Sequence, residues 1–356
     1  MTDKLTSRER FQRMYEHRDA DRVPIIDSPW EGTLLRWRSE GLGEQDWVEY
    51  FDIDRVAHIG VDPSPRYPAA TVSIDERFHT YTTPYGVTLK QLRVPDSTPE
   101  YVAFTVTDPD SWRAAKARMT PTPDRIDWAR LERLYPVWER EGHWITGDFW
   151  FGFDITHSWF VGTETLLIAL AEEPDWCRDM FDHFLDMNIA LFEQILAAGY
   201  RLDEINWPDD MGYKQNQFFS RRMYSDLLLP VQQRAIDWAH SHGIRARLHS
   251  CGDIRPFVPL LVDAGLDALN PLEVKAGMDP FALKAQYGDR LVLHGGLNAV
   301  LFEDTDATIA EIQRLLPVMK ENGGYIFSSD HSVPNTVSLE EMAAIIQTAK
   351  EYGSYS

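Results

Sequence analysis

Residues 247–256, RLHSCGDIRP, place a histidine and a cysteine two positions apart, His249 and Cys251. On an extended segment, side chains at positions i and i+2 point to the same side, so both can reach one ion. Neutral imidazole and thiolate are both zinc ligands. The only other cysteine, Cys177, lies in a helical pattern and is expected in the core. A histidine and a cysteine at this spacing, without other ligands, are more often a hydrogen-bonded histidine and a small buried cysteine than a metal site. A metal site therefore requires further ligands.

Eight strand-like segments frame this pair, and most of them are followed by an amphipathic helix. They are RVPIID, VAHIGVD, HWITGDF, EINWPDD, IRARLHSCG, DALNPLE, RLVLHGGLN and GYIFSSDH. Alternation of strands and helices predicts parallel βα units, and eight such strands predict a (β/α)8 barrel of the TIM type. A doubly wound open sheet is the alternative, but RVPIIDSPW lacks the glycine-rich turn that usually follows the first strand of that fold.

Nearly every one of these strands ends in or near a polar or ionisable residue, and in a barrel the chemistry gathers at those ends. Glu273 ends the strand after the histidine–cysteine pair, and His331 ends the strand two further on. We therefore expect a zinc site, with a general acid or base role for His331 as the alternative to ligation. The expected ligands are His249, Cys251, Glu273 and His331. Carboxylates expected to line the mouth as proton carriers or orienting groups are Asp148, Asp209, Asp210 and Asp330. Strand ends without an assigned role are Asp27, Asp62, His294 and Asn298.

Composition limits the classes of partner. The 356 residues are 44% hydrophobic, which is enough for a large core, and the formal net charge is −21. So acidic a chain disfavours nucleic acid, since phosphate contacts need clustered Lys and Arg. Two cysteines cannot form a disulfide framework. The first 24 residues lack the apolar region of a signal peptide. No apolar run approaches the length of a transmembrane helix. We expect a cytoplasmic protein that does not enter a membrane.

Several segments resemble the uroporphyrinogen decarboxylase superfamily along nearly the whole chain. They are SRERFQRMYEHRDADRVPI, WEGTLLRWRSEGL, INWPDDMGYK, RARLHSCGDI, ALNPLEVKAGMD, VLHGGLN and GGYIFSSDHSVP. The resemblance implies a distorted (β/α)8 barrel. True decarboxylases of this family carry an M-R-Q-A-G-R segment that grips substrate carboxylates, whereas this chain has SPWEGTLLRWRSEG there, with Arg36 and Arg38. Porphyrin decarboxylation is therefore not expected.

Another branch of the superfamily, the methylcobamide:coenzyme M methyltransferases and their relatives, is similar at the pair itself. Those enzymes take H-x-C from one strand and a cysteine from the last strand. In the similar site of cobalamin-independent methionine synthase, a Glu lies some twenty residues after the H-x-C. His249, Cys251 and Glu273 fit that pattern, while His331 stands near the position of the final cysteine. The resemblance implies a zinc-dependent methyltransferase. Because the chain lacks a D-x-H-x-x-G cobalamin signature, a corrinoid would arrive on a partner protein.

Two other functions remain as alternatives. One is a metal-independent decarboxylase or lyase acting on a small non-porphyrin substrate through the aspartates and His331. The other is a non-catalytic or corrinoid-binding relative, which the many ionisable strand ends disfavour. We expect one barrel domain over residues 1–356. Residues 71–93 should form an excursion, an antiparallel hairpin that serves as a lid or as a homodimer contact.

Overall fold

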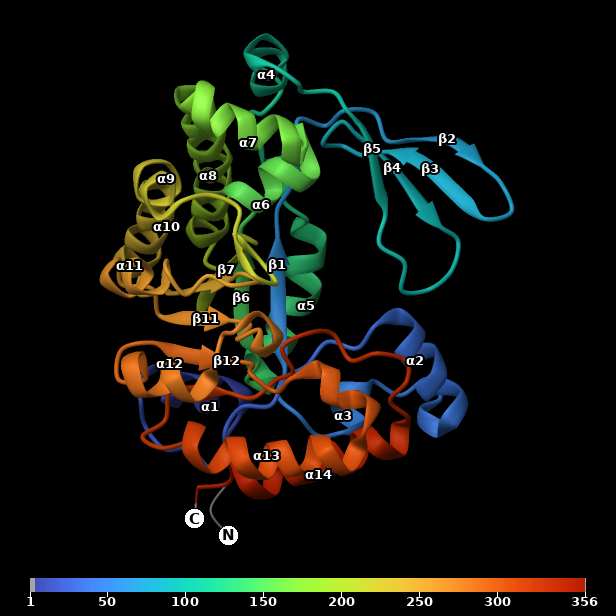
Figure 1. Ribbon diagram of the computed structural model, residues 1–356, viewed down its shortest axis with the longest axis vertical. Helices are drawn as coiled ribbons and strands as arrows, with labels where there is room; N and C mark the ends of the chain where they lie inside the picture. Colours follow the sequence, from blue (N-terminus) through green and yellow to red (C-terminus); the bar gives the residue numbers. More distant parts are fainter. Residues whose placement is uncertain (1–3, 356) are drawn as a thin grey trace.

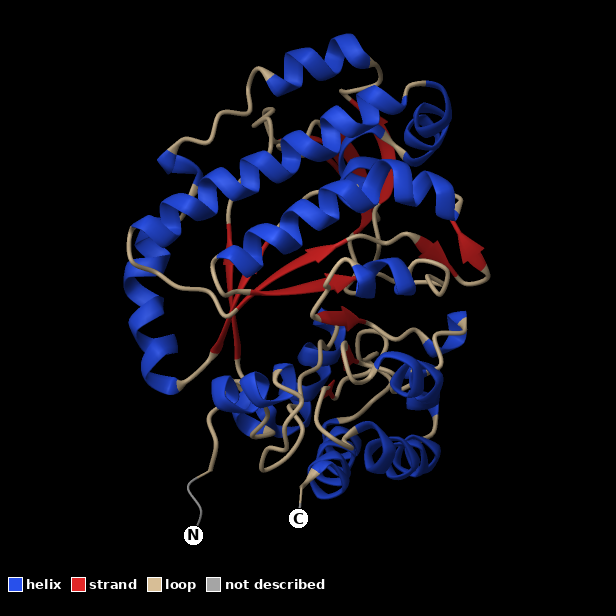
Figure 2. Cartoon of the chain, turned by 90° about the vertical axis from the view of Figure 1, so that its left-hand side faces the viewer, coloured by secondary structure: helices blue, strands red, loops and turns tan. Residues whose placement is uncertain are grey.

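A computed structural model describes residues 4–355 and has a curled parallel sheet of seven strands at its centre (Figure 2). Every neighbouring pair in it is parallel, and the spatial order follows the chain order. The strands are β1 (Val56–Gly60), β6 (Trp144–Asp148), β7 (Glu204–Pro208), β10 (Arg245–His249), β11 (Ala268–Asn270), β12 (Val292–His294) and β13 (Tyr325–Ile326).

Amphipathic helices connect these strands and cover the outer face of the sheet, as the alternating sequence pattern predicted (Figure 1). Between β1 and β13 lie α4 (Pro109–Lys116), α5 (Trp128–Glu141), α6 (Phe153–Thr156), α7 (Thr163–Glu172), α8 (Pro174–Ala197), α9 (Arg221–Met223), α10 (Leu229–Ser241), α11 (Val258–Asp263), α12 (Pro280–Tyr287) and α13 (Thr305–Met319). The chain closes with α14 (Leu339–Gly353). Cys177 is fully buried on α8, so its expected place in the core is confirmed.

The predicted first strand, RVPIID, does not join the sheet as a strand. It forms only isolated bridges, an antiparallel one between Arg22 and Ser354 and a parallel one between Ile25 and Phe327, and Pro29, two residues further on, bridges in parallel to Val333. The N–H of Asp54, just before β1, donates to the Ile25 carbonyl at 3.0 Å. Because proline has no N–H, Pro24 and Pro29 leave gaps in any continuous ladder. The sheet is therefore a seven-stranded curled sheet with a bridging segment rather than a regular closed ring of eight strands.

Helix α1 (Ser7–Tyr15) covers the amino ends of the strands, and α2 (Glu31–Trp37) and α3 (Trp47–Tyr50) follow the bridging segment. Thr6 caps α1 in a capping box with Glu9, which satisfies N–H groups at the first turn. The rings of Phe11 and Tyr15 stack on Trp144 of β6, each with a centroid separation of 5.3 Å. This aromatic stack closes the amino end of the sheet and leaves the carboxyl end for a site.

A buried polar network lies just above the stack. Glu204 on β7 is 1% exposed and accepts hydrogen bonds from Arg247 Nε at 2.8 Å and from Thr146 Oγ1 at 3.0 Å. The hydroxyl of Tyr15 donates to the other carboxylate oxygen of Glu204. The network joins α1 to β6, β7 and β10 and supplies the counter-charge of a buried guanidinium.

The excursion is larger than the predicted hairpin. Residues 70–104 form a four-stranded antiparallel sheet of β2 (Ala70–Ile74), β3 (Phe78–Thr82), β4 (Val87–Leu92) and β5 (Glu100–Phe104), which projects away from the parallel sheet (Figure 1). A Pro-Tyr-Gly turn, residues 84–86, connects β3 to β4. Strand β5 lies outside the predicted excursion, although its sequence, EYVAF, is rich in strand formers. Pairing with β4 gives this short segment the partner that its sequence alone cannot reveal.

Replacing the buried counter-ion tests how far this architecture depends on its interior charge pair. Glu204→Gln leaves the Arg247 guanidinium buried without an anion, and we expect the free energy of unfolding to fall by about 3 kcal/mol. The control is Asp52→Asn, because the Lys4–Asp52 pair is 60% and 64% exposed and should contribute less than about 1 kcal/mol. Urea unfolding of both variants measures the difference. Equal losses would contradict the role assigned to Glu204.

Candidate active site

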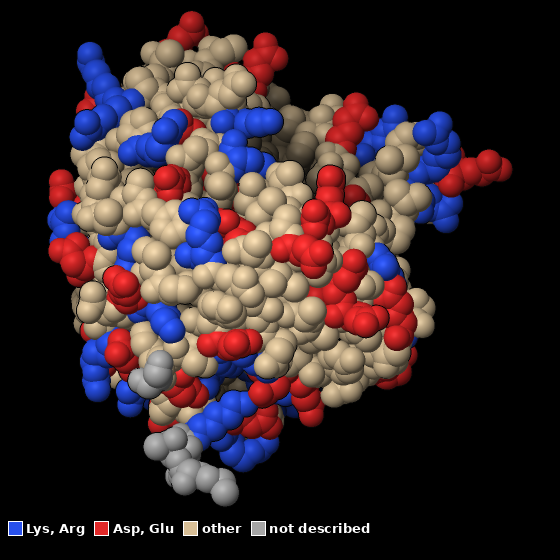
Figure 3. Space-filling model, turned by 60° about the horizontal axis from the view of Figure 1, so that its bottom comes forward, with Lys and Arg blue, Asp and Glu red and all other residues tan. Residues whose placement is uncertain are grey.

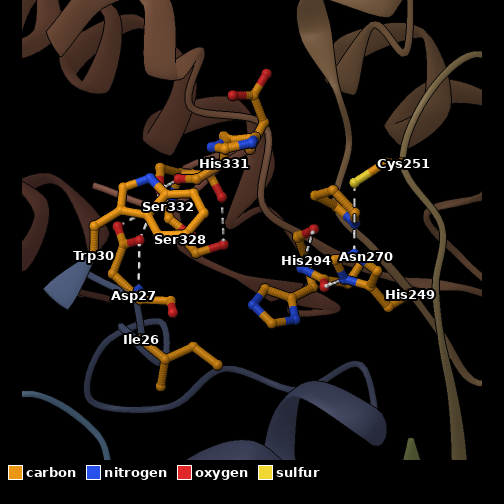
Figure 4. A pocket seen from close by; sticks show the side chains of 14 residues that line it. Ile26, Asp27, Trp30, His249, Cys251, Asn270, His294, Ser328, His331 and Ser332 are labelled. Atoms are coloured by element: carbon orange, nitrogen blue, oxygen red, sulfur yellow. Dashed lines mark hydrogen bonds between the residues drawn. The ribbon is translucent and has the colours of Figure 1, made fainter. Parts of the chain in front are cut away.

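A cavity of about 390 Å³ opens at the carboxyl end of the parallel sheet, opposite α1. The bridging segment, residues 25–30, supplies one wall, and the ends of β10, β11 and β12 supply the floor and the other wall. The loop after β13 completes the rim (Figure 4). The lining residues are Ile26, Asp27, Ser28, Trp30, His249, Cys251, Asn270, Pro271, His294, Ser328, Ser329, Asp330, His331 and Ser332.

Three potential metal ligands converge at one wall of this cavity. A ligand atom of Asp210, one of His249 and the Cys251 thiol all lie within 4.8 Å of one another. Cys251 Sγ is 3.5 Å from His249 Nε2, and His249 Nε2 is 3.8 Å from Asp210 Oδ1. The pair that the sequence singled out is thus completed by a carboxylate that had been expected as a proton carrier.

Backbone geometry explains why these side chains meet. His249 is the last residue of β10 and pairs in register with Pro208, so Asp210 follows two positions beyond the paired residue on β7. The N–H of Cys251 donates to Asp210 Oδ1 at 2.7 Å, which fixes the carboxylate against the loop. Gly252 has φ +81° and approaches the backbone of Gly212 so closely that a Cβ would clash. Glycine is required at position 252 for this turn.

A neighbouring side chain also orients the imidazole. His249 Nδ1 is 2.7 Å from Asn270 Oδ1 on the adjacent strand β11. An amide oxygen only accepts hydrogen bonds, so Nδ1 carries the proton and Nε2 presents its lone pair toward Cys251 and Asp210. Metal-binding histidines characteristically donate their second nitrogen to an oxygen in this way.

The donor set fits zinc. Tetrahedral zinc with normal bond lengths separates a thiolate sulfur from an imidazole nitrogen by about 3.5 Å, and the nitrogen from a carboxylate oxygen by about 3.4 Å. The corresponding distances here are 3.5 Å and 3.8 Å. Three protein ligands leave one position for water or substrate, which is the pattern of catalytic zinc sites.

Electrostatics at the trio also suit a cation. Burial, with Asp210 and Glu273 nearby, raises the pKa of the Cys251 thiol far above its usual range. Burial likewise raises the pKa of Asp210, and the neighbouring His249 partly offsets it. Without a positive charge the thiol therefore stays protonated, whereas a divalent ion favours the thiolate and releases its proton.

The other two predicted zinc ligands lie outside this trio. Glu273 is buried behind the cysteine loop, where its carboxylate accepts the Gly252 N–H at 2.5 Å and pairs with Lys275 at 3.4 Å. His331 is exposed on the opposite wall, with its ring centroid 6.0 Å from that of Trp30. Glu273 is thus placed to support the cysteine loop, and His331 to meet the far end of a bound molecule.

Asp209, the neighbour of Asp210, is fully buried and does not line the cavity. Its carboxylate accepts the Asp154 N–H at 2.9 Å and a Gln232 amide N–H at 2.7 Å. Gly152 packs so closely against it that a Cβ would lie 2.4 Å from Asp209 Oδ2. Burial raises the pKa of Asp209 to about 8 in spite of these donors. The structure places this side chain as a tie between β7, α6 and α10.

Asp330 and Asp148, the remaining predicted carboxylates, both have protein partners. Asp330 lines the cavity, but its two oxygens accept backbone N–H groups of Val274 and Ala299 at 2.9 and 2.8 Å, which ties together the loops after β11 and β12. Asp148 lies outside the cavity lining and accepts a hydrogen bond from His58 Nδ1 at 2.9 Å. Neither belongs to the candidate metal-binding trio of Asp210, His249 and Cys251.

Sequence reasoning gave no role to three residues that shape the cavity. Asn270 orients His249, Trp30 forms part of the far wall, and His294 lies on the floor (Figure 4). Asn270 could have been found from strand register, because it stands directly opposite His249 in the β10–β11 ladder. Trp30 belongs to an irregular segment, and no periodic pattern marks it.

The family model for uroporphyrinogen decarboxylase (URO-D) matches residues 157–352, more than half of the chain. The chain belongs to the URO-D family. This match covers the strands from β7 onward and includes all three members of the metal-binding trio. The family resemblance expected from the sequence is thereby confirmed.

Structural comparison finds a similar fold along nearly the whole length of this chain. A methyltransferase from Methanosarcina mazei superposes with a TM-score of 0.64 at 15% sequence identity, covering 98% of this chain and 99% of that one. At this identity the likeness concerns the fold. No curated protein matched the sequence. Within residues 4–355, no helix combines the length and the apolar character needed to cross a bilayer.

The raised pKa of Asp209 predicts a pH-dependent stability. Its folded-state pKa of about 8 exceeds the ordinary aspartate value of about 4, so the folded state binds the extra proton. Stabilisation from that proton is lost as the pH rises from about 4 to 8, by at most about 1.4 kcal/mol per pH unit. Asp209→Asn cannot titrate and should lack this decline.

Urea unfolding at pH 5.5, 7.0 and 8.5 provides the measurement. The amide disturbs two N–H donors at every pH, so the variant should have a lower free energy of unfolding than wild type throughout. The difference between the two free energies should become smaller as the pH rises. If the difference in free energy of unfolding is the same at all three pH values, the assignment of the proton to Asp209 is wrong.

Proposed function

We propose that this URO-D family member is a zinc-dependent methyltransferase that acts on a small molecule in the 390 Å³ cavity. The observation that carries the proposal is the convergence of Asp210, His249 and Cys251 at the cavity wall, with Asn270 holding the imidazole. The half-buried Cys251 thiol would bind zinc as a thiolate beside the Asp210 carboxylate, because metal binding releases the thiol proton.

Features of the cavity support a methyl donor or acceptor over a polycarboxylate. None of its lining residues is Lys or Arg. Arg36, from the segment that replaces the carboxylate-gripping motif, donates instead to the carbonyls of Asn335 and Thr336, each at 2.7 Å. A porphyrinogen with several carboxylates would find no guanidinium on these walls. The protein found in the structural comparison, which has the same fold, is described as a methyltransferase.

Zinc bound at this site would supply a Lewis acid that makes a substrate thiol nucleophilic or weakens the bond from a heteroatom to a methyl group. The side chains of Asp210, His249 and Cys251 would hold the ion, and the cavity walls would align donor and acceptor. The methyl carbon then forms a bond with the electron pair of the attacking nucleophile, while the pair of the broken bond stays on the leaving heteroatom. A protonated thiol acceptor must lose its proton, and the open mouth gives that proton access to water.

The second methyl carrier is proposed to come from outside the chain. A corrinoid on a partner protein would exchange the methyl group through its cobalt, and a free thiol or folate is the other acceptor class. The cavity opens at the carboxyl end of the sheet, where a partner could present such a group (Figure 4).

Metal content tests the proposal directly. Wild-type protein should bind about one zinc ion per chain, and Cys251→Ser should lose most of it while retaining its fold, because the thiol contributes no core packing. Cys177→Ala is the matched control, since it removes the other cysteine from a buried site remote from the cavity. Elemental analysis and circular dichroism of the three proteins give the result. Wild-type turnover without bound metal would refute the proposal in favour of a metal-independent lyase.

The orienting role of Asn270 predicts a graded effect. Asn270→Ala should weaken zinc binding by about 10- to 100-fold, because the imidazole loses the acceptor that fixes its tautomer. His331→Ala should leave zinc affinity unchanged, because that ring lies on the opposite wall. Competition with a fluorescent zinc chelator measures both affinities. A large loss of zinc in His331→Ala would restore His331 to the ligand set and contradict the present one.

A further inference from the structure

Acidic and aromatic side chains line the cavity wall opposite the metal-binding trio. Asp27, Trp30 and His331 face the cavity there, across from His249 and Cys251 (Figure 4). Asp27 and Trp30 come from the bridging segment, and His331 comes from the loop after β13. A molecule long enough to span the cavity from the trio would meet this wall with its other end.

Asp27 presents a carboxylate without a counter-ion. It accepts hydrogen bonds from Ser329 Oγ at 2.7 Å, from the Ser28 N–H at 2.8 Å and from the Ser329 N–H at 3.2 Å. None of the ion pairs within residues 4–355 includes it. Burial and the nearby Asp330 raise its pKa to about 6. A carboxylate offers about four acceptor positions, so this one can still accept a hydrogen bond from a ligand.

The floor of the same cavity holds a polar group without a hydrogen-bond partner. His294 is 4% exposed, and its Nδ1 has no hydrogen-bond partner among the described residues. Burial and the neighbouring Arg247 lower the pKa of this imidazole well below its usual range, which keeps the ring neutral. A neutral imidazole has one N–H donor and one accepting nitrogen, so in either tautomer the floor offers the ligand one more polar contact.

Trp30 adds an aromatic surface beside Asp27. Its indole lies in the lining, and the imidazole of His331 is tilted 42° against it at 6.0 Å between centroids. An indole face attracts a cation by its quadrupole, most strongly where water is partly excluded. Carboxylate and aromatic face together match a protonated amine, which carries positive charge and several N–H donors.

We propose that the natural small-molecule substrate carries a protonated amine at the end remote from the metal, bound by Asp27 against Trp30. This inference rests on the proposed function, since the metal-binding trio is taken to hold the other end. It assigns Asp27 as a specificity-determining residue, and it predicts discrimination by terminal charge among molecules of equal length.

Three thiols with the same two-carbon stem provide the test: 2-aminoethanethiol, 2-mercaptoethanol and 3-mercaptopropionate. They differ in a terminal group that is cationic, neutral or anionic. Isothermal titration of zinc-loaded protein near pH 7.5 should give a dissociation constant about ten- to a hundredfold lower for the amine than for the alcohol, with the acid weakest. This range is what one charge-assisted hydrogen bond in a partly desolvated site contributes.

Asp27→Asn should reduce the preference for the amine to less than about threefold while leaving the affinity of the alcohol unchanged within about twofold. Asp148→Asn is the matched control, because that carboxylate lies outside the cavity lining and pairs with His58. It should keep the full preference. Equal binding of amine and acid by wild-type protein, or an undiminished preference in Asp27→Asn, would overturn the amine subsite.

The same titrations on zinc-free protein separate the two proposals. If zinc does not strengthen binding of any thiol, the proposed role of the metal fails, while the order of the three terminal groups still decides the amine subsite. If zinc strengthens all three thiols but their order follows no charge preference, the proposed function stands and the subsite is rejected. Absence of binding by all three thiols to both forms would overturn both.

Discussion

The hydrogen bond between His249 Nδ1 and Asn270 Oδ1 is the contact on which the proposed chemistry depends. It fixes the tautomer of the imidazole and turns the remaining lone pair toward Cys251 and Asp210. The bond exists because β10 and β11 are parallel and in a register that sets the two residues side by side. A shift of one residue would turn alternate side chains to the other face of the sheet and abolish the trio.

The scaffold below the site keeps that register. α1 closes the amino end through its stack on Trp144, and the Tyr15–Glu204–Arg247 network joins the helix to three strands. Opposite charges pair in this interior, whereas Asp27 at the carboxyl end has no cation beside it. On the molecular surface, acidic and basic side chains are interspersed over the face shown in Figure 3, which has no continuous basic region of the kind that binds nucleic acid.

Division of labour among the carboxylates follows from their environments. Asp209 and Asp210 are adjacent in sequence, yet one is enclosed by N–H donors of α6 and α10 while the other reaches the metal-binding trio. Asp330 resembles Asp209, since both of its oxygens are occupied by backbone groups. Such carboxylates stabilise loops at the mouth, and they leave the chemistry to side chains with free ligand atoms.

The sequence by itself determined the alternation of strands and helices, the family and the histidine–cysteine pair, because these depend on local periodicity and on spacing within one strand. It could not show that Pro24 and Pro29 would leave the first segment as a bridge, nor that residues 100–104 would pair with β4. Only the tertiary structure decided the third member of the trio. Glu273, His331 and Asp210 all follow strands, and only the register and the direction of each loop determine which of them faces the cysteine. Long-range contacts of this kind are set by packing between segments distant in the chain, which no local pattern encodes.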